Sequence, residues 1–397
     1  MIKDKSIICF AGEDWWYHHP HSKNHIMRRL ARAGNRVVFV NSISMGLPDM
    51  KSPDFTGKIK RKLKSFAKFV RRADDGIIVV TPVVTPFYSS RVGRALNRFL
   101  LIAQFKILSV AFNLRNPVLW IAIPTAGEIV GRLNESALVY QVSDKYDANQ
   151  MDHATSGNII SHMHKELLQK ADLIYYSGRK LFEEDLVANP TIEPKAKLLE
   201  QAVDFEHFAS ATAKDWPEAD DIDGIPHPRL GYFGAIETWL LDQQMIRYIS
   251  EKHPDWHWVL LGLKAAKLEI EDLPNVHYLG AKPYAEMPRY AAGFDVCVLP
   301  WVTDNKFVSY GSAIKVREYL ATGKPVVITP LYEYESWSDI LRISRGYDNF
   351  IAHIEDALSH EDANKKSMRQ ESVKESTWDV RTEMVSRDIE AIIKHQN

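Results

Sequence analysis

The chain has 397 residues, of which 45% are hydrophobic and 25% are charged, with a formal net charge of −1. This composition is typical of a globular protein of about two domains and excludes a disordered or fibrous chain. The near-neutral charge gives no preference for nucleic acid, and we expect none as a partner. Cys9 and Cys297 lie in apolar runs, which favours buried thiols in a cytoplasmic protein over a disulfide or a metal site.

The first predicted unit begins with a strand over 7–11, a helix after residue 22 and a second strand over 36–41. Such a unit predicts a parallel pair with a right-handed crossover, and ligands bind at the carboxyl end of such strands. The loop there is rich in aromatic and histidine residues, which suit sugar stacking and hydrogen bonding. Its predicted acceptor-binding residues are Asp14, Trp15, Trp16, Tyr17, His18 and His19. The alternative is a lid that packs on the domain.

Basic residues are concentrated between Lys51 and Arg115, where 14 Lys or Arg stand against three acids. Within residues 58–72 they alternate with apolar residues near helical spacing, which predicts a helix on an anionic membrane surface. Phosphate-rich partners are the rival. The predicted membrane residues are Lys58, Lys60, Arg61, Lys62, Lys64, Phe66 and Phe69. Residues 91–115 repeat the pattern, but we expect most of their apolar positions to pack on the core. No window is long and apolar enough to predict a membrane span, and no signal peptide is predicted.

Further strands are predicted over 118–123, 138–142, 173–176 and 197–200. Asp144 and Asp147 follow the second of these. Either carboxylate could serve as a general base for an acceptor hydroxyl, or could cap a helix or pair with Lys145.

The alternation of strands and helices restarts at residue 229, with strands predicted over 229–236, 256–261, 276–279, 295–300 and 326–329. The predicted fold class is α/β, with two doubly wound Rossmann-like sheets facing across a cleft. The predicted divisions are an acceptor-binding domain at 1–208, a linker at 209–228, a donor domain at 229–377 and a helix at 378–397. That last helix could cross back to the first domain.

One stretch in the second half predicts a loop, a helix and a strand in quick succession. Ser312 is a candidate N-cap and Gly323 a candidate left-handed C-cap. Lys315 in the first turn and the helix dipole would favour an anion, and Glu318 one turn later could accept a hydrogen bond from a sugar hydroxyl. The alternative is an exposed ion pair of little consequence between these two side chains.

The second half resembles the donor domain of GT-B nucleotide-sugar glycosyltransferases of the retaining, family-four-like group. The motifs that carry the resemblance are 231–234 (GYFG), 254–256 (PDW), 273–280 (LPNVHYLG), 283–288 (PYAEMP), 295–300 and 314–327, in this order and spacing. More loosely, residues 14–21 and 201–208 resemble bacterial cell-surface polysaccharide transferases such as the xanthan glucuronosyltransferase type.

This resemblance implies that Lys315 and the Ser312 backbone hold the donor pyrophosphate, that Glu318 binds the ribose and that Gly234 approaches the donor phosphate. Tyr310 stands where such enzymes usually carry a second glutamate. The full set of predicted donor-binding residues is Gly234, Tyr310, Ser312, Ile314, Lys315 and Glu318.

We therefore expect Lys315 and the helix N-terminus to stabilise the departing nucleoside diphosphate, with no metal or other cofactor. If the reaction inverts the anomeric carbon, Asp144 is the first candidate base and His21 the second; if it retains, the donor phosphate takes the proton. The expected reaction transfers sugar from a UDP- or GDP-linked donor to a lipid-linked or polysaccharide acceptor at the inner face of the cytoplasmic membrane. A nucleotide-sugar epimerase and a carbohydrate-binding protein without turnover are the alternatives.

Overall fold

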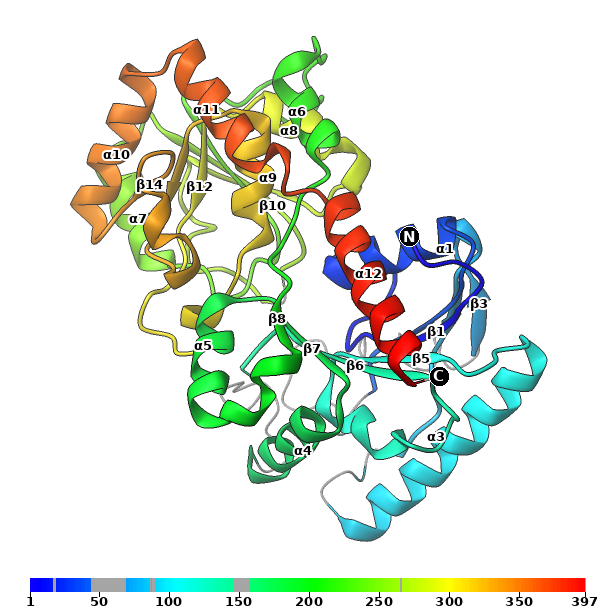
Figure 1. The fold of residues 1–397 in the computed structure, drawn as a ribbon. Helices are drawn as coiled ribbons and strands as arrows, with labels where there is room; N and C mark the ends of the chain where they lie inside the picture. Colours follow the sequence, from blue (N-terminus) through cyan, green and yellow to red (C-terminus); the bar gives the residue numbers. More distant parts are fainter. Residues whose placement is uncertain are drawn as a thin grey trace. The chain divides into compact units, whose positions relative to one another are not determined.

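The computed structural model describes residues 1–16, 19–43, 69–85, 87, 90–145, 157–264 and 266–396. The chain divides into two compact units, residues 1–200 with 379–397 and residues 201–378. Each contains one largely parallel sheet with helices packed around it (Figure 1), as predicted for a pair of Rossmann-like domains.

The first unit is built on eight strands in the order β3-β4-β2-β1-β5-β6-β7-β8. All neighbours are parallel except β3 and β4. The strands are β1 (Ser6–Phe10), β2 (Arg36–Val40), β3 (Val70–Arg72), β4 (Ile78–Val80), β5 (Val118–Ile121), β6 (Ala137–Val142), β7 (Leu173–Tyr176) and β8 (Ala196–Leu198). The central strands are buried on both faces because helices cover both, which explains their continuous apolar runs.

Among the described residues, the helices of this unit are α1 (Ser22–Arg32), α3 (Arg91–Ala111), α4 (Gly157–Lys170) and α5 (Arg179–Ala188). Short 3₁₀ turns are η1 (Asp74–Gly76), η2 (Pro124–Ile129) and η4 (Pro190–Lys195). Helix α12 (Trp378–Gln396) also belongs here from Asp379 onward. Asp388 fixes it to the sheet, because its carboxylate accepts hydrogen bonds from Tyr175 Oη at 2.8 Å and Lys197 Nζ at 2.6 Å.

The second unit has six parallel strands in the order β11-β10-β9-β12-β13-β14. These are β9 (Arg229–Phe233), β10 (His257–Leu261), β11 (Val276–Gly280), β12 (Val296–Leu299), β13 (Val326–Ile328) and β14 (Arg342–Ile343). The helices are α6 (Phe205–Ala213), α7 (Gln243–Lys252), α8 (Met287–Ala292), α9 (Ile314–Thr322), α10 (Tyr347–Ser359) and α11 (Ala363–Lys374), with the turns η5 (Tyr284–Glu286), η6 (Val308–Tyr310) and η7 (Tyr332–Trp337).

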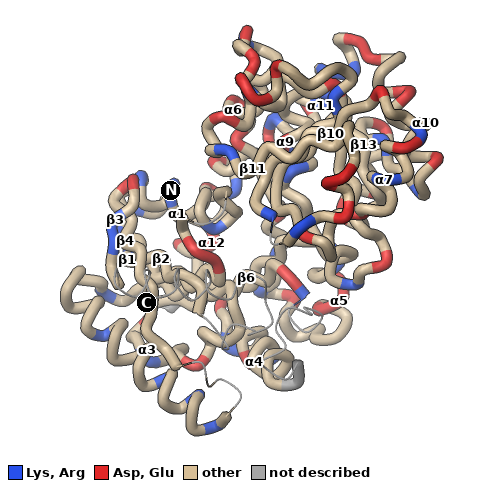
Figure 2. The backbone as a smooth tube through the Cα atoms, turned by 180° about the vertical axis from the view of Figure 1, so that it is seen from behind, with Lys and Arg blue, Asp and Glu red and all other residues tan. Residues whose placement is uncertain are grey.

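Two features differ from the sequence predictions. Residues 201–228, part of which was predicted to be a linker, lie in the second unit, where α6 packs against α8 and α9. Helix α3 also differs, because it leaves five large apolar side chains exposed instead of packing most of them on the core. They are Val92, Leu96, Phe99, Ile107 and Val110. Figure 2 shows Lys and Arg along this helix, which contains no acidic residue.

Gly231 tests the packing of the second unit. A Cβ at this position in β9 would lie 2.0 Å from Cδ2 of Phe294 and within 2.3 Å of two further ring atoms. Gly231→Ala should therefore lower the free energy of unfolding by about 1–3 kcal/mol, because a buried ring must move. Gly224→Ala is the control, since nothing lies within 4 Å of a Cβ there. Equal denaturant midpoints for the two variants would contradict this packing.

Candidate functional site

The N-terminus of α9 is the centre of the candidate site in the second unit. The helix begins at Ile314 with Ala313 as its N-cap, and no side chain caps it. Ser312 was predicted to be the N-cap, and this prediction is wrong by one residue. Its Oγ is buried and accepts or donates no hydrogen bond within the described part of the chain. Because no side chain caps the first turn, its N–H groups and the helix dipole are available to bind an anion.

Gly234, which directly follows β9, leaves space for the Lys315 side chain because it has no side chain of its own. A Cβ on Gly234 would lie 1.7 Å from Lys315 Cε and 2.6 Å from Nζ, and the glycine has φ +138°. The lysine chain therefore lies directly over the glycine backbone, with Nζ 5.2 Å from the centroid of the Trp301 ring. Gly262, at the end of β10, packs as closely on Gly234, since its own Cβ would lie 1.7 Å from the Gly234 carbonyl oxygen. Two glycine turns thus pack together at the carboxyl edge of the sheet, and the Lys315 side chain lies over one of them.

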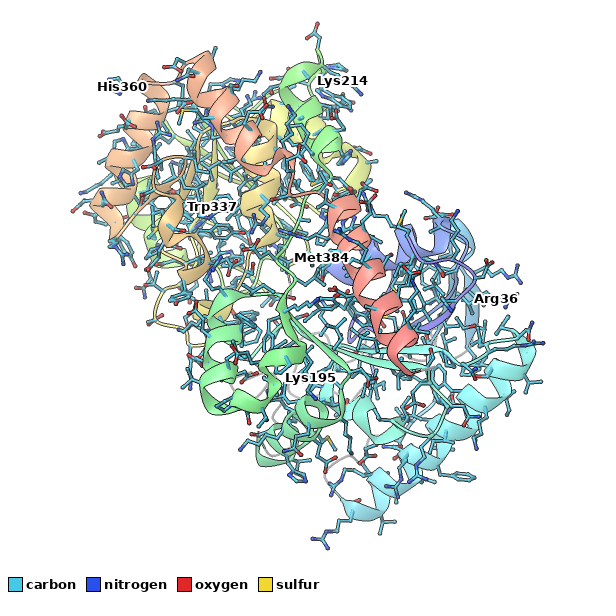
Figure 3. The ribbon with its side chains drawn as sticks, viewed as in Figure 1. Arg36, Lys195, Lys214, Trp337, His360 and Met384 are labelled. Carbon is cyan, nitrogen blue, oxygen red and sulfur yellow. The ribbon has the colours of Figure 1, made fainter. Side chains whose placement is uncertain are left out.

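Aromatic side chains hold α9 against β9. Tyr319 Oη accepts a hydrogen bond from Phe233 N–H at 3.1 Å, and the two ring centroids are 4.7 Å apart. Tyr334 Oη donates to the carbonyl of the N-cap Ala313 at 2.8 Å. The guanidinium of buried Arg317 lies 5.0 Å from the centroid of the Trp337 ring, which Figure 3 labels. These positioning residues were not predicted, because an aromatic residue inside a helix or strand is usually interpreted as core.

Burial governs the charges of this site. It lowers the pKa of Lys315, which the Glu318 charge opposes. It raises the pKa of Glu318 to about 8, an effect that Lys315 opposes and the charge of Asp204 reinforces. Glu318 is only 6% exposed, so it is not the solvated member of a surface ion pair. A neutral Glu318 carboxyl can both donate to and accept from a sugar hydroxyl.

Asp204 is a residue of this neighbourhood that the sequence interpretation placed elsewhere. The resemblance assigned residues 201–208 to the end of the first domain, but Asp204 is the N-cap of α6 in the second unit. It accepts a hydrogen bond from Tyr284 Oη at 3.1 Å. Tyr310, in η6 just before α9, is 8% exposed. Ile314 is half-buried as the first residue of the helix.

A second cluster in the first unit brings together both candidate bases. His21 Nδ1 lies 2.6 Å from a Glu13 carboxylate oxygen, and buried Lys23 lies 3.8 Å from the same oxygen. Burial raises the pKa of Asp144, while the charges of Lys23 and His21 lower it and Glu13 raises it. Asp144 and His21 therefore share one electrostatic environment, together with Glu13 and Lys23, which were not predicted.

The aromatic loop of the first unit has two faces. Trp15 is buried. Its backbone N–H donates to Asn41 Oδ1 at 3.0 Å, and its ring centroid lies 4.8 Å from that of Phe39. This is the packing that the lid alternative expected. Trp16 is 47% exposed and carries the Arg71 guanidinium 3.7 Å above its ring. Asp14 is exposed and His19 half-buried, while the predictions for Tyr17 and His18 fall outside the described residues.

The predicted membrane segment also falls largely outside the described residues. Only Phe69 of that set is described, and it is half-buried next to β3. The predictions for Lys58, Lys60, Arg61, Lys62, Lys64 and Phe66 therefore stay predictions.

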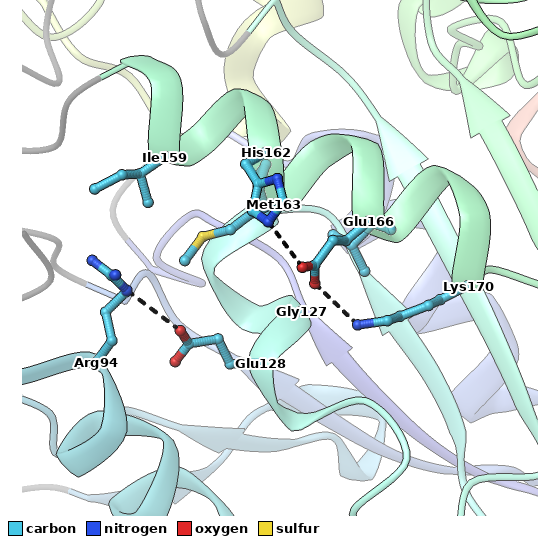
Figure 4. A pocket seen from close by; sticks show the side chains of 10 residues that line it. Arg94, Gly127, Glu128, Ile159, His162, Met163, Glu166 and Lys170 are labelled. Atoms are coloured by element: carbon cyan, nitrogen blue, oxygen red, sulfur yellow. Dashed lines mark hydrogen bonds and ion pairs between the residues drawn. The ribbon is translucent and has the colours of Figure 1, made fainter. Parts of the chain in front are cut away.

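A pocket of about 330 Å³ opens where η2 follows β5 (Figure 4). Glu166 of α4 pairs with His162 at 3.1 Å and with Lys170 at 3.0 Å, and Arg94 of α3 lies 3.9 Å from Glu128. Burial raises the pKa of Glu128. This pocket begins at η2, beyond the carboxyl end of β5, and extends along α4 as far as Lys170. No motif in the sequence indicated it, since its residues come from three separate segments.

Over the residues described here, no group of three or more His, Cys, Asp or Glu side chains is arranged to hold a metal ion. The Cys9 and Cys297 thiols are free and buried, and burial raises the pKa of each, which disfavours the thiolate form.

Comparison with known proteins supports the same reading of the second unit. Residues 227–360 match the family Glycosyl transferases group 1. A Bacillus subtilis (strain 168) protein, TuaH, whose name gives it a proposed role as a teichuronic acid biosynthesis glycosyltransferase, is 26% identical over 285 residues, which cover 66% of this chain and 68% of that protein.

Solved structures resemble the whole chain. Sucrose-phosphate synthase from Thermosynechococcus elongatus has a TM-score of 0.69 at 13% identity, covering 99% of this chain and 100% of that one. Anabaena HepE in complex with UDP and glucose has a TM-score of 0.62 at 12% identity, covering 98% and 100%. At these identities the structural likeness establishes the fold.

Glu318→Gln tests the electrostatics of the site. The pKa of Glu318 is about 8 in the folded chain against about 4.3 in an unfolded one. Between these values the folded state binds more protons than the unfolded state, so this carboxyl makes stability fall as pH rises. The variant should show a flatter decrease in unfolding free energy from pH 5 to 8. Identical pH profiles for variant and wild type would show that Glu318 is not held neutral by burial.

Proposed function

We propose that the chain is a GT-B nucleotide-sugar glycosyltransferase, which transfers a sugar from a nucleoside diphosphate donor to a lipid-linked or polysaccharide acceptor at a membrane surface. The observation that carries the donor assignment is the position of Lys315 over Gly234 at the uncapped start of α9. A diphosphate there would meet a full positive charge and the helix dipole. Glu318, one turn along, is available to the ribose.

A UDP-linked donor is favoured over a GDP-linked one. The similar Anabaena protein was solved with UDP and glucose, and a similar structure from E. coli was solved with UDP-2-fluoro glucose. The acceptor proposal draws on TuaH, whose name assigns it a proposed role in teichuronic acid biosynthesis. Membrane association of this chain remains part of the proposal.

The chemistry follows from the charge that develops during transfer. As the bond between the anomeric carbon and the diphosphate breaks, negative charge grows on the leaving oxygen. Lys315 and the first N–H groups of α9 would stabilise this charge, and no metal is required for that role. If the acceptor hydroxyl attacks from the opposite face, Asp144 is the proposed base, with His21 as the second candidate.

Lys315→Ala tests the donor site. UDP binding to the native protein raises its stability by RT ln(1 + [L]/Kd), or about 2.7 kcal/mol at a hundred times Kd. The variant should weaken UDP binding at least tenfold, measured as the loss of the UDP-induced thermal shift. Lys214→Ala, an exposed lysine of the same unit labelled in Figure 3, is the control. Equal UDP shifts in both variants would refute the phosphate role of Lys315.

Asp144→Asn tests the base. Loss of a general base typically lowers turnover by roughly 10²–10⁴-fold, so transfer from UDP-sugars to a membrane lipid extract should fall by that amount. The UDP-induced thermal shift should be unchanged. Because burial raises the pKa of Asp144, wild-type turnover should rise as pH increases through that pKa. If the variant keeps wild-type turnover, another group is the general base. If the wild type shows a UDP-induced thermal shift but no turnover, a carbohydrate-binding role is favoured.

A further inference from the structure

Helix α3 is apolar on two opposite sides. One side packs on the first unit through Gly93, Asn97, Leu101, Phe105 and Leu108. The other side exposes the five apolar residues already named, which we call the outer stripe: Val92, Leu96, Phe99, Ile107 and Val110. At 100° per residue these five fall on one face, opposite the buried set. From the first to the last the outer stripe extends over about 27 Å.

The exposure of the outer stripe is unusually high for large apolar side chains. Val92 is 81% exposed and Val110 85%, with Phe99 at 67% and Ile107 at 69%. The segment before α3 is held to the helix, because Gln104 accepts a hydrogen bond from the N–H of Val83 and donates one to its carbonyl, both at 2.8 Å. Val83 and Phe87 are themselves about half exposed. Contiguous exposed apolar surface of this kind marks an interaction site.

The charges beside the outer stripe identify its partner. Helix α3 contains Arg91, Arg94, Arg98 and Lys106 and no acidic residue. Three of these side chains are exposed, while Arg94 pairs with Glu128. Packing of α3 against α3 of a second copy would bring like charges together, which opposes a symmetric dimer through this helix. An anionic membrane surface instead supplies acyl chains for the apolar residues and negative headgroups for the cations.

We infer that α3 is the helix by which the enzyme lies on an anionic membrane, with the outer stripe at the level of the headgroups and upper acyl chains. This inference rests on the proposed function, because a lipid-linked acceptor must be reached at a bilayer. Within the part of the chain that the structure describes, no helix has both the length and the apolarity to cross a membrane. Helix α3 would therefore lie along the surface rather than span it.

Vesicle flotation of the full chain tests this inference. Vesicles of phosphatidylcholine with one-third phosphatidylglycerol should bind the wild type, and pure phosphatidylcholine should bind it much less. The triple variant Phe99→Gln, Ile107→Gln, Val110→Gln should lower the bound fraction roughly tenfold or more. Replacing Arg91, Arg98 and Lys106 by Gln should remove the preference for the anionic vesicles, since each basic residue contributes roughly fivefold.

Val187→Gln is the matched control, because Val187 is an exposed apolar residue of α5 at 83% exposure. It should float as wild type does. All variants should keep their melting temperature and their UDP-induced thermal shift, so loss of flotation is separable from failure of the donor-site proposal. Unchanged flotation of the triple variant would overturn the inference. So would a wild type that does not float but forms a dimer, measured by light scattering, that the triple variant abolishes.

Discussion

The second unit depends on one close contact, in which the Lys315 side chain lies across the backbone of Gly234. A Cβ at Gly234 would overlap the lysine chain, which would have to move, and the φ of +138° at this position disfavours any residue other than glycine. The contact joins the turn after β9 to the first turn of α9. Tyr319, within α9, accepts a hydrogen bond from the β9 backbone, and Tyr334 donates one to the carbonyl of the N-cap residue, so both hold the helix in place. A positive charge is thereby held at a helix N-terminus without a capping side chain. That combination is suited to a diphosphate.

Burial of the site also makes the pKa values of its charged side chains sensitive to a bound ligand. Lys315 and Glu318 are both pushed toward their neutral forms, and Asp204 adds to the effect on Glu318. A bound diphosphate would reverse the effect on Lys315, since a nearby anion favours the charged amine. The first unit repeats this arrangement in another form, with half-buried Asp144 influenced by the charges of Lys23, His21 and Glu13. Each unit thus contains a carboxyl group, buried Glu318 in one and half-buried Asp144 in the other, whose pKa is raised by desolvation.

Local signals predicted the fold well and the surroundings of the site poorly. The strand Val326–Ile328 and the C-cap at Gly323, which has φ +77°, are each determined by a few adjacent residues, so the sequence predicts them. Asp204 and Tyr334 reach α9 from distant segments, and such contacts have no periodic signature. The prediction for α3 was wrong for a different reason, because apolar residues at helical spacing lie on two opposite sides of this helix. Periodicity alone could not tell which face packs on the protein and which stays exposed.

A structure of the protein with UDP bound measures the central claim most directly. The account predicts the diphosphate oxygens within hydrogen-bond distance of Lys315 Nζ and the N–H groups that open α9, with the ribose beside Glu318. Density for the nucleotide at any other edge of either sheet, with Lys315 still lying over Gly234 and touching no phosphate, would contradict it.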